Sequence, residues 1–297
     1  MRLSKRDYLI KTFSKTNKKD YENYILTAIW HKLGCLDIKP VTQQYVKRTD
    51  TGYALIDLYF PQVHVGVEVD EAFHKKQVEA DELRMDDIIS SISEEEISDF
   101  RVFRIDATQT IEQINKDIDG VVHYIKQKAD SLQLSWPTYE EELAQLMQKE
   151  TLSIYDDISF QYIKDIANTI FNRNAKGYQR SYFRVRENLW IWCPKLSINV
   201  GGDLKSAAGG WINVLAEDWS YIDESNQDEE ILQAREESFA ETVKKGRERA
   251  VFAKFKDNLG VNRYRFIGVF KVIEDLQPEN RRFIRFTRIR ESLEIDK

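Results

Sequence analysis

Three carboxylates fall close together in the segment LIDLYFPQVHVGVEVDEAFH, residues 55–74. Asp57 lies in its first apolar run, and Glu68 and Asp70 lie in the second. Like charges in contact raise one another's pKa, so a fold keeps such a group only where a cation neutralises it or water reaches it freely. A purely oxygen ligand set suits Mg²⁺, with Mn²⁺ as an alternative. These residues therefore predict a metal site; the plainer interpretation is a solvated strand end.

Two strands joined by a tight turn would bring the carboxylates together. Apolar residues alternate with other residues on both sides of Pro61-Gln62, which is the spacing of pleated strands. A hairpin that turns near Gln62 places Asp57 roughly opposite Glu68. Asp70 then points to the same face, about 7 Å further along the strand.

The spacing of Asp57 from Glu68-Val69-Asp70 resembles the core of the PD-(D/E)XK nucleases. Residues 68–74, EVDEAFH, are similar to the E-[IV]-D-G-x-x-H stretch of the very-short-patch-repair-like branch of that superfamily. The resemblance implies a metal-dependent phosphodiesterase with Asp57, Glu68 and Asp70 around the metal. It also implies a mixed α/β sheet with flanking helices.

The sequence departs from that motif at two positions. Its final Lys is absent because Asp70 stands in that place, and Glu71 replaces the usual Gly. The base that activates water is therefore open. His74 is the local candidate for the base or for orienting the water, with Lys75 and Lys76 as alternatives. A histidine just after a strand is equally consistent with a surface role.

The surrounding elements follow the order α-β-β-β-α-β-α. Apolar residues at i, i+3, i+4 spacing predict a helix over residues 18–33, with Glu22 at the edge of the apolar stripe. In PD-(D/E)XK folds the first helix often contributes an acidic residue to the metal shell, so Glu22 is a candidate, although a solvent-facing Glu fits equally. The other predicted elements are strands over 40–46 and 100–106 and helices over 76–97 and 110–132.

Composition predicts two domains. The chain has 297 residues, of which 42% are apolar, enough for two cores. We expect a nuclease domain over residues 1–132, a linker helix over 133–150 and a β-rich domain over 151–297. We expect a single helix over 159–172 at the start of the last domain. No apolar run is long enough to span a bilayer, so we expect no membrane and a bacterial cytoplasmic location.

Charge is segregated along the chain. The net charge of -6 argues against a protein that coats nucleic acid indiscriminately. Residues 1–50 nevertheless carry 11 Lys+Arg against 5 Asp+Glu, and residues 244–297 carry 15 against 8. Basic ends on an acidic chain allow a local phosphate-binding face.

Tryptophans concentrate near a glycine-rich loop over residues 201–210. Trp211 and Asn213 follow the loop, and carboxylates follow them. An aromatic face, an amide and a carboxylate are what a protein needs to hold an unstacked base. An aromatic core beside a loop is the alternative interpretation, and composition alone favours it.

The chain also resembles the Pvu-Rts-type restriction endonucleases that depend on 5-hydroxymethylcytosine. The resemblance is carried by KKDYENYILTAIWHKLG, PVTQQYVKRTD, EVDEAFH, AAGGWINVLAEDWSYI and YRFIGVFKV and covers nearly the whole chain. It implies a C-terminal SRA-like domain that accommodates a flipped modified cytosine. It further implies a homodimer that makes double-strand breaks in DNA with 5-hydroxymethylcytosine or glucosylated 5-hydroxymethylcytosine, at a distance from that base.

The resemblance favours a specific set of base-contacting residues. Trp211 is expected to stack on the base or line the pocket, Asn213 to contact the base edge or the added hydroxyl, and Glu224 to accept from the cytosine amino group. Trp192 and Asn199 are further candidates. The competing interpretations are a modified-base reader without catalysis, a mismatch endonuclease and an RNA nuclease.

Overall fold

The structure is a computed structural model that describes residues 4–14, 20–48, 52–70, 85–93, 99–156, 158–178, 180–200, 203–205, 208–280 and 282–296. The chain forms two compact units. Unit 1 comprises Met1–Asp81, Ser90–Thr138 and Asn258–Val261, and unit 2 comprises Glu82–Ile89, Tyr139–Asp257 and Asn262–Lys297. Each unit has its own buried apolar core.

Unit 1 is built on a five-stranded mixed sheet in the order β4-β1-β2-β3-β5. Strands β1, β2 and β3 are antiparallel neighbours, while β5 runs parallel to β3 and β4 parallel to β1. A 3₁₀ turn, η2 (Pro61–Val63), closes the β2–β3 hairpin as predicted. The strand bounds are β1 Val41–Arg48, β2 Gly52–Phe60, β3 Val65–Asp70, β4 Ile92–Ser93 and β5 Arg101–Asp106.

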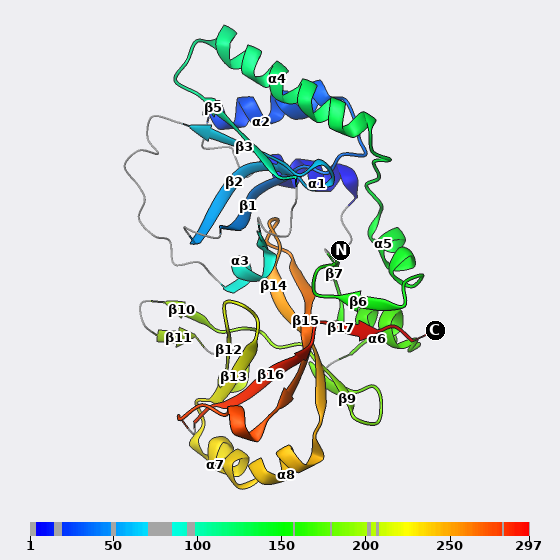
Figure 1. Cartoon of the computed structure of the whole chain (residues 1–297), viewed down its shortest axis with the longest axis vertical. Helices are drawn as coiled ribbons and strands as arrows, with labels where there is room; N and C mark the ends of the chain where they lie inside the picture. Colours follow the sequence, from blue (N-terminus) through cyan, green and yellow to red (C-terminus); the bar gives the residue numbers. More distant parts are fainter. Residues whose placement is uncertain are drawn as a thin grey trace. The chain divides into compact units, whose positions relative to one another are not determined.

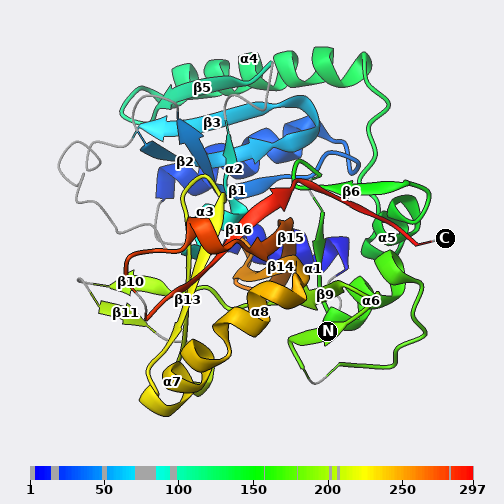
Figure 2. The ribbon, with the colours of Figure 1, turned by 60° about the horizontal axis from the view of Figure 1, so that its bottom comes forward.

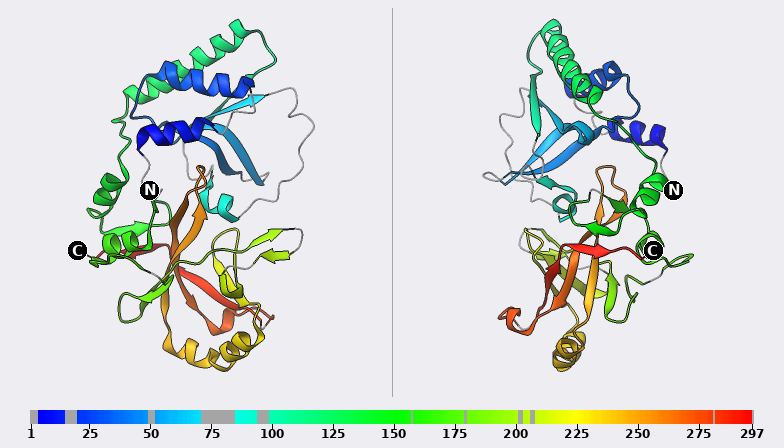
Figure 3. Two further views of the ribbon diagram at one scale, coloured as in Figure 1. Left: turned by 180° about the vertical axis from the view of Figure 1, so that it is seen from behind. Right: turned by 45° about the vertical axis from the view of Figure 1, so that its right-hand side comes forward.

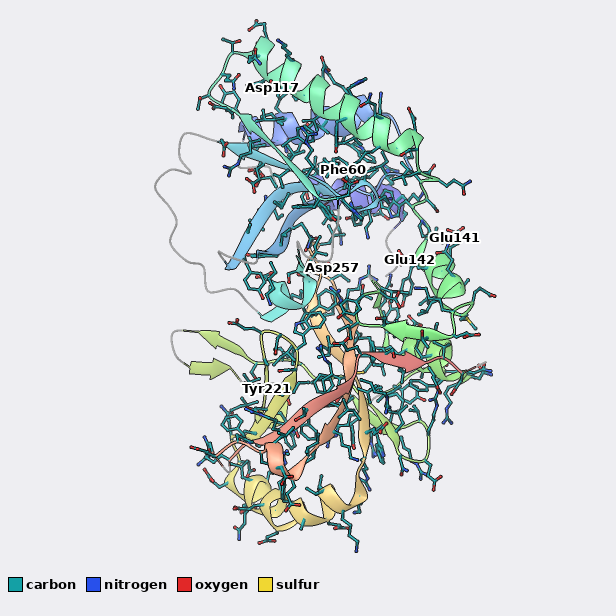
Figure 4. The ribbon with its side chains drawn as sticks, in the orientation of Figure 1. Phe60, Asp117, Glu141, Glu142, Tyr221 and Asp257 are labelled. Carbon is teal, nitrogen blue, oxygen red and sulfur yellow. The ribbon has the colours of Figure 1, made fainter. Side chains whose placement is uncertain are left out.

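Helices α1 (Lys5–Phe13), α2 (Asp20–Leu33) and α4 (Ile111–Asp130) pack on this sheet, and Figures 1 and 2 show α4 lying along β5. Helix α4 is amphipathic, and the hydroxyl of its N-cap Thr110 accepts a hydrogen bond from the backbone of Gln113. The core includes the fully buried Phe60, which Figure 4 labels.

The predicted helix over 76–97 is wrong within the described residues. Helix α3 covers Met85–Ser90, and the chain then forms β4, which pairs with β1 through Val46 and Ile92. Pairing to an available strand edge outweighs the local helical pattern at this point. Residues 71–84 lie outside the described part of the chain.

Unit 2 is dominated by an eight-stranded sheet in the order β12-β13-β16-β15-β14-β9-β8, with β7 also paired to β15. Figure 3 shows the long antiparallel β14–β15 hairpin within it. The strands are β7 Ser159–Phe160, β8 Tyr182–Arg184, β9 Leu189–Trp192, β12 Trp211–Leu215, β13 Tyr221–Asn226, β14 Glu248–Lys256, β15 Asn262–Val272 and β16 Ile284–Arg290.

Short elements surround this sheet. The remaining strands form two pairs, β6 (Thr151–Ser153) with β17 (Ser292–Glu294), and β10 (Ile198–Val200) with β11 (Asp203–Lys205). In the described part of unit 2, the helices other than α3 are α5 Tyr139–Leu146, α6 Ile163–Phe171, α7 Glu229–Glu237 and α8 Phe239–Lys245, and the 3₁₀ turns are η5 Ala208–Gly210 and η6 Glu274–Leu276. No helix in the described part of the chain is long and apolar enough to cross a membrane.

The predicted helix over 159–172 starts later than expected. Ser159 and Phe160 form β7, and α6 begins only at Ile163. Phe160 is fully buried, with its ring 5.7 Å from that of Phe252. Burial of this ring against the main sheet explains why the first residues of the amphipathic run take a strand conformation.

Candidate functional sites

The β2–β3 hairpin places the first two predicted carboxylates on neighbouring strands. Leu58 pairs with Val67. The next residues away from the turn, Asp57 on β2 and Glu68 on β3, therefore lie opposite one another. The backbone N–H of Val69 donates to Asp57 Oδ2 at 2.9 Å, which fixes that carboxylate against β3. Glu68 is 9% exposed, and burial of an acid at this level requires a partner.

Gln43 joins two acidic residues of unit 1. Its Nε2 donates to Asp57 Oδ1 at 3.1 Å and to Glu22 Oε1 at 3.3 Å. Glu22 lies on α2 one turn before the core residue Ile25 and is 1% exposed, so it faces the interior. Gln43 has φ 57° inside β1, a left-handed conformation that costs a non-glycine residue energy and is often kept at functional sites.

Arg104 on β5 reaches the other side of the acidic cluster. It is paired in register with Glu68, and its Nε and Nη2 lie 2.8 and 2.7 Å from Glu68 Oε2. The same Nε lies 4.0 Å from Oδ2 of Asp70, whose carboxylate is exposed. The hydrogen bond to Glu68 and the negative charges of Glu68 and Asp70 raise the pKa of Arg104. The cluster therefore carries its own neutralising cation.

The described residues bring four predicted acids together on neighbouring strands and α2 as two pairs: Gln43 joins Glu22 to Asp57, and Arg104 joins Glu68 to Asp70. The backbone N–H of Val69, which donates to Asp57, connects the two pairs, and these residues are called the acidic network. His74, Lys75 and Lys76 lie outside the described residues. Sequence reasoning missed Gln43 and Arg104. A signal existed for Arg104, because it lies in the predicted strand over 100–106 next to the acidic hairpin, but nothing in the sequence indicates the left-handed backbone of Gln43.

Unit 2 contains a cavity of about 590 Å³ beside its main sheet. Its lining combines aromatic rings, an amide and charged groups, which include Tyr182, Trp192, Lys195, Trp211, Asn213, Glu224, Arg235, Arg249, Lys254 and Phe286. Four of the five residues predicted to contact a base therefore line one cavity. The fifth, Asn199, lies on β10, and its side chain is outside the described part of the structure.

Asn213 and Glu224 form a directly opposed pair on β12 and β13. Opposed residues on one sheet face have neighbouring side chains. Asn213 is 4% exposed, and its Nδ2 donates to the carbonyl of Lys195 at 3.1 Å. Its Oδ1 is buried and has no hydrogen-bond partner among the described residues. A buried acceptor without a partner is costly, so this oxygen is suited to receive a donor from a ligand.

Arg235 on α7 fixes the second member of that pair. Its Nη2 lies 2.8 Å from Glu224 Oε1, and its guanidinium carbon lies 5.2 Å from the ring centroid of Trp211. Burial lowers the pKa of Arg235, the charge of Glu224 raises it, and the charge of Arg249 lowers it again. The ion pair holds Glu224 in place beside the tryptophan predicted to stack on a base.

Arg249 on β14 occupies an aromatic cage in the same cavity. Its guanidinium carbon lies 3.9 Å from the ring centroid of Phe286, 4.8 Å from that of Tyr182 and 5.0 Å from that of Trp192. Such contacts are favourable when the cation is partly desolvated. Among the described residues, the cavity lining thus has four basic side chains, Lys195, Arg235, Arg249 and Lys254, against the single carboxylate of Glu224.

Comparison with known proteins agrees with this two-part arrangement. A family model described as restriction endonuclease PvuRts1 I-like, N-terminal, matches residues 6–132, and the SET and RING associated (SRA) domain model matches residues 145–295. No curated protein matches the chain. A solved structure described as "The 5-Hydroxymethylcytosine-Specific Restriction Enzyme AbaSI" is 26% identical, with a TM-score of 0.72, over 98% of this chain and 97% of that one.

These matches confirm the predicted fold class, which joins a restriction-endonuclease-like α/β domain to a β-rich SRA domain. The described carboxylate network lies within the residues matched by the first model, and the cavity lies within those matched by the second. The chain belongs to the PvuRts1 I-like restriction endonucleases that carry an SRA domain.

Proposed function

We propose that this protein is a magnesium-dependent endonuclease that cuts double-stranded DNA containing 5-hydroxymethylcytosine or its glucosylated form. It cuts at a distance from the modified base, which unit 2 holds flipped out of the duplex. The similarity to AbaSI, a 5-hydroxymethylcytosine-specific restriction enzyme, supports this choice of substrate. The observation that carries it is the buried Asn213, which lines an aromatic cavity opposite Glu224 and whose Oδ1 has no hydrogen-bond partner among the described residues.

A paired cytosine hides its Watson–Crick edge, so a protein that checks the base closely must flip it out, at a cost of a few kcal/mol. Stacking on an aromatic ring contributes about 1–3 kcal/mol per base and offsets much of that cost. Trp211 supplies the ring. Glu224 accepts from the cytosine amino group, and Asn213 Oδ1 accepts a second donor from the amino group or the added hydroxyl. The cavity of about 590 Å³ leaves room for a glucosyl group.

The nuclease half of the proposal rests on whether the acidic network fits Mg²⁺. Its donors are carboxylate oxygens, which Mg²⁺ prefers. Among the described residues, no three acidic, histidine or cysteine side chains are arranged to hold one ion. Mg²⁺ normally takes only one or two carboxylates and completes its shell with water and substrate phosphate, so Asp57 and Glu68 suffice, with Asp70 binding the metal or its water. The bound ion would lower the pKa of a water molecule and polarise the scissile phosphate.

The neighbouring side chains prepare these ligands. Gln43 donates to Asp57 and to the buried Glu22 and so holds Asp57 in one orientation. Glu22 therefore helps to orient the metal ligand Asp57 through Gln43 without binding the metal itself. Arg104 neutralises Glu68 before the metal binds and leaves other guanidinium N–H groups for a phosphate oxygen. His74 remains a proposed base or water-orienting residue.

Arg104→Gln is expected to strengthen metal binding by the free protein by a factor of about 1.4 to 5. Arg104 and the cation compete for Glu68, and an ion pair with an arginine that is 66% exposed contributes about 0.2–1 kcal/mol. Titration of the DNA-free protein with Mn²⁺, followed by electron paramagnetic resonance, measures the affinity. Weaker Mn²⁺ binding in the variant would show that Arg104 organises the metal ligands and does not compete for them.

We also propose a homodimer, because one nuclease centre cuts one strand and a double-strand break needs two. Light scattering is expected to give twice the chain mass of 35.0 kDa, in the free protein or on DNA with two modified sites. A monomer under both conditions, with each strand nicked independently, would contradict this assembly.

The main test is digestion of matched duplexes that contain cytosine, 5-methylcytosine, 5-hydroxymethylcytosine or glucosylated 5-hydroxymethylcytosine, with Mg²⁺ and with EDTA. We expect double-strand cleavage of the 5-hydroxymethylcytosine and glucosylated duplexes with Mg²⁺, and no cleavage of any duplex with EDTA. Modified-DNA binding without cleavage would support a reader that lacks catalysis. Equal cleavage of all four duplexes, or of RNA, would overturn the proposed function.

A further inference from the structure

We propose that Arg249 forms the subsite for an oxygen atom on the C5 substituent of the flipped cytosine, and that this subsite also accepts an anionic substituent such as a carboxylate. This inference rests on the proposed function of unit 2. It adds a residue that contacts only the modification, whereas Glu224 accepts from the amino group, which unmodified cytosine also carries.

Position in the sheet places Arg249 beside the predicted base edge. Glu224 on β13 pairs with Ile284 on β16, and Phe286 lies two residues further along β16, on the same face. Two residues of a strand span about 7 Å. The guanidinium of Arg249 lies 3.9 Å from the Phe286 ring centroid. Arg249 therefore lies near a position that is two strand residues, about 7 Å, from Glu224. In cytosine, C5 is bonded to the carbon that carries the amino group. A base whose amino group reaches Glu224 therefore turns its C5 substituent toward groups next to Glu224.

The charge balance of the cavity points to an acceptor at this position. Arg235 is paired with Glu224, whereas Arg249 has no carboxylate within ion-pair distance among the described residues. The guanidinium of Arg249 makes three ring contacts but donates no hydrogen bond to any described residue, so its N–H groups are available as donors to a ligand. Planar carboxylates and hydroxyl oxygens are natural partners for such N–H groups. Arg249 also acts on Arg235 through its charge, so an anion bound between them relieves repulsion inside the cavity.

The test is equilibrium binding to short duplexes with one central cytosine, 5-methylcytosine, 5-hydroxymethylcytosine or 5-carboxylcytosine. Fluorescence anisotropy in EDTA measures binding without cleavage. The wild-type protein is expected to bind the hydroxymethyl and carboxyl duplexes at least tenfold more tightly than the methyl duplex. Arg249→Gln is expected to reduce both preferences to less than threefold and to leave affinity for the methyl and unmodified duplexes nearly unchanged.

Two variants control for charge and folding. Arg247→Gln removes a neighbouring cation that stacks on Trp190 and does not line the cavity, and it is expected to keep the wild-type preferences. Arg249→Lys keeps the charge and is expected to retain part of the preference for the carboxyl duplex. Circular dichroism melting verifies that each variant is folded, and the Lys variant provides the test if the Gln variant unfolds.

The outcomes separate this inference from the proposed function. If Arg249 instead binds a backbone phosphate, Arg249→Gln weakens binding to all four duplexes alike and reduces the slope of log affinity against log salt by about one. That result, or a wild-type protein that prefers 5-hydroxymethylcytosine but binds 5-carboxylcytosine no better than 5-methylcytosine, overturns the inference and leaves the proposed function standing. Equal wild-type binding of all four duplexes overturns the proposed function itself.

Discussion

Asp57→Asn is expected to reduce cleavage of modified DNA by about a thousandfold or more while leaving its binding nearly unchanged. A metal ion on the scissile phosphate contributes several kcal/mol to transition-state stabilisation, and each 1.36 kcal/mol corresponds to a factor of about ten in rate. Asn keeps the shape of the side chain and can still accept from Val69, but it lacks the charge that binds a cation. Single-turnover cleavage and anisotropy binding on the same duplex measure the two effects.

The matched control is Asp117→Asn on α4, an acid of unit 1 that is labelled in Figure 4 and accepts from Gln113 one turn earlier. It is expected to cleave at the wild-type rate because it belongs to no part of the acidic network. Glu68→Gln should match Asp57→Asn. Cleavage within tenfold of the wild-type rate by both Asp57→Asn and Glu68→Gln would remove the hairpin carboxylates from the mechanism.

The hairpin at the centre of this site could be predicted because its information is local. Alternating apolar residues fix which side chains share a face, and Pro61 limits where the turn can fall, so the opposition of Asp57 and Glu68 follows from the sequence. Gln43 could not be predicted in the same way. Its role depends on a left-handed backbone inside β1, which a non-glycine residue adopts only when the surrounding structure imposes it.

Contacts that depend on sheet order could not be predicted from local pattern. Arg104 meets Glu68 because β5 pairs in parallel with β3, and this pairing joins residues 65–70 to residues 101–106, which are far apart in the sequence. The residue pattern over 76–97 predicts a helix because local spacing contains no information about the edge of β1, with which Ile92 pairs. The acids could therefore be predicted from the local pattern, whereas their partners depend on long-range strand pairing.

The cavity of unit 2 depends in the same way on a strand pairing, that of β12 with β13, which the local sequence pattern does not indicate. Composition indicates a charged segment over residues 223–246, yet its first residues belong to β13, where Glu224 stands opposite Asn213. Charged residues on a strand resemble a solvated loop in the sequence. Only burial between β12 and β16 shows that the carboxylate of Glu224 faces a cavity and is neutralised by Arg235.

Asn213→Ala and Trp211→Ala are each expected to weaken binding of 5-hydroxymethylcytosine DNA by about 5- to 150-fold and to leave binding of unmodified DNA unchanged. The first change removes an acceptor for a buried donor of the base, which costs about 1–3 kcal/mol when that donor is left without a partner. The second removes stacking of similar value. Asn262→Ala, an exposed amide outside the cavity, is the matched control and should bind like the wild-type protein.

Cleavage supplies the second measurement on these pocket variants. Unit 1 contains the proposed nuclease centre, so Mn²⁺ binding by Asn213→Ala should equal that of the wild-type protein even though its cleavage of modified DNA falls with affinity. Raising the DNA concentration above the weakened dissociation constant should then restore most of the single-turnover rate. If Asn213→Ala and Trp211→Ala keep the full wild-type preference for hydroxymethylated over plain cytosine, the cavity is not the base pocket, and the unpartnered oxygen of Asn213 has another role.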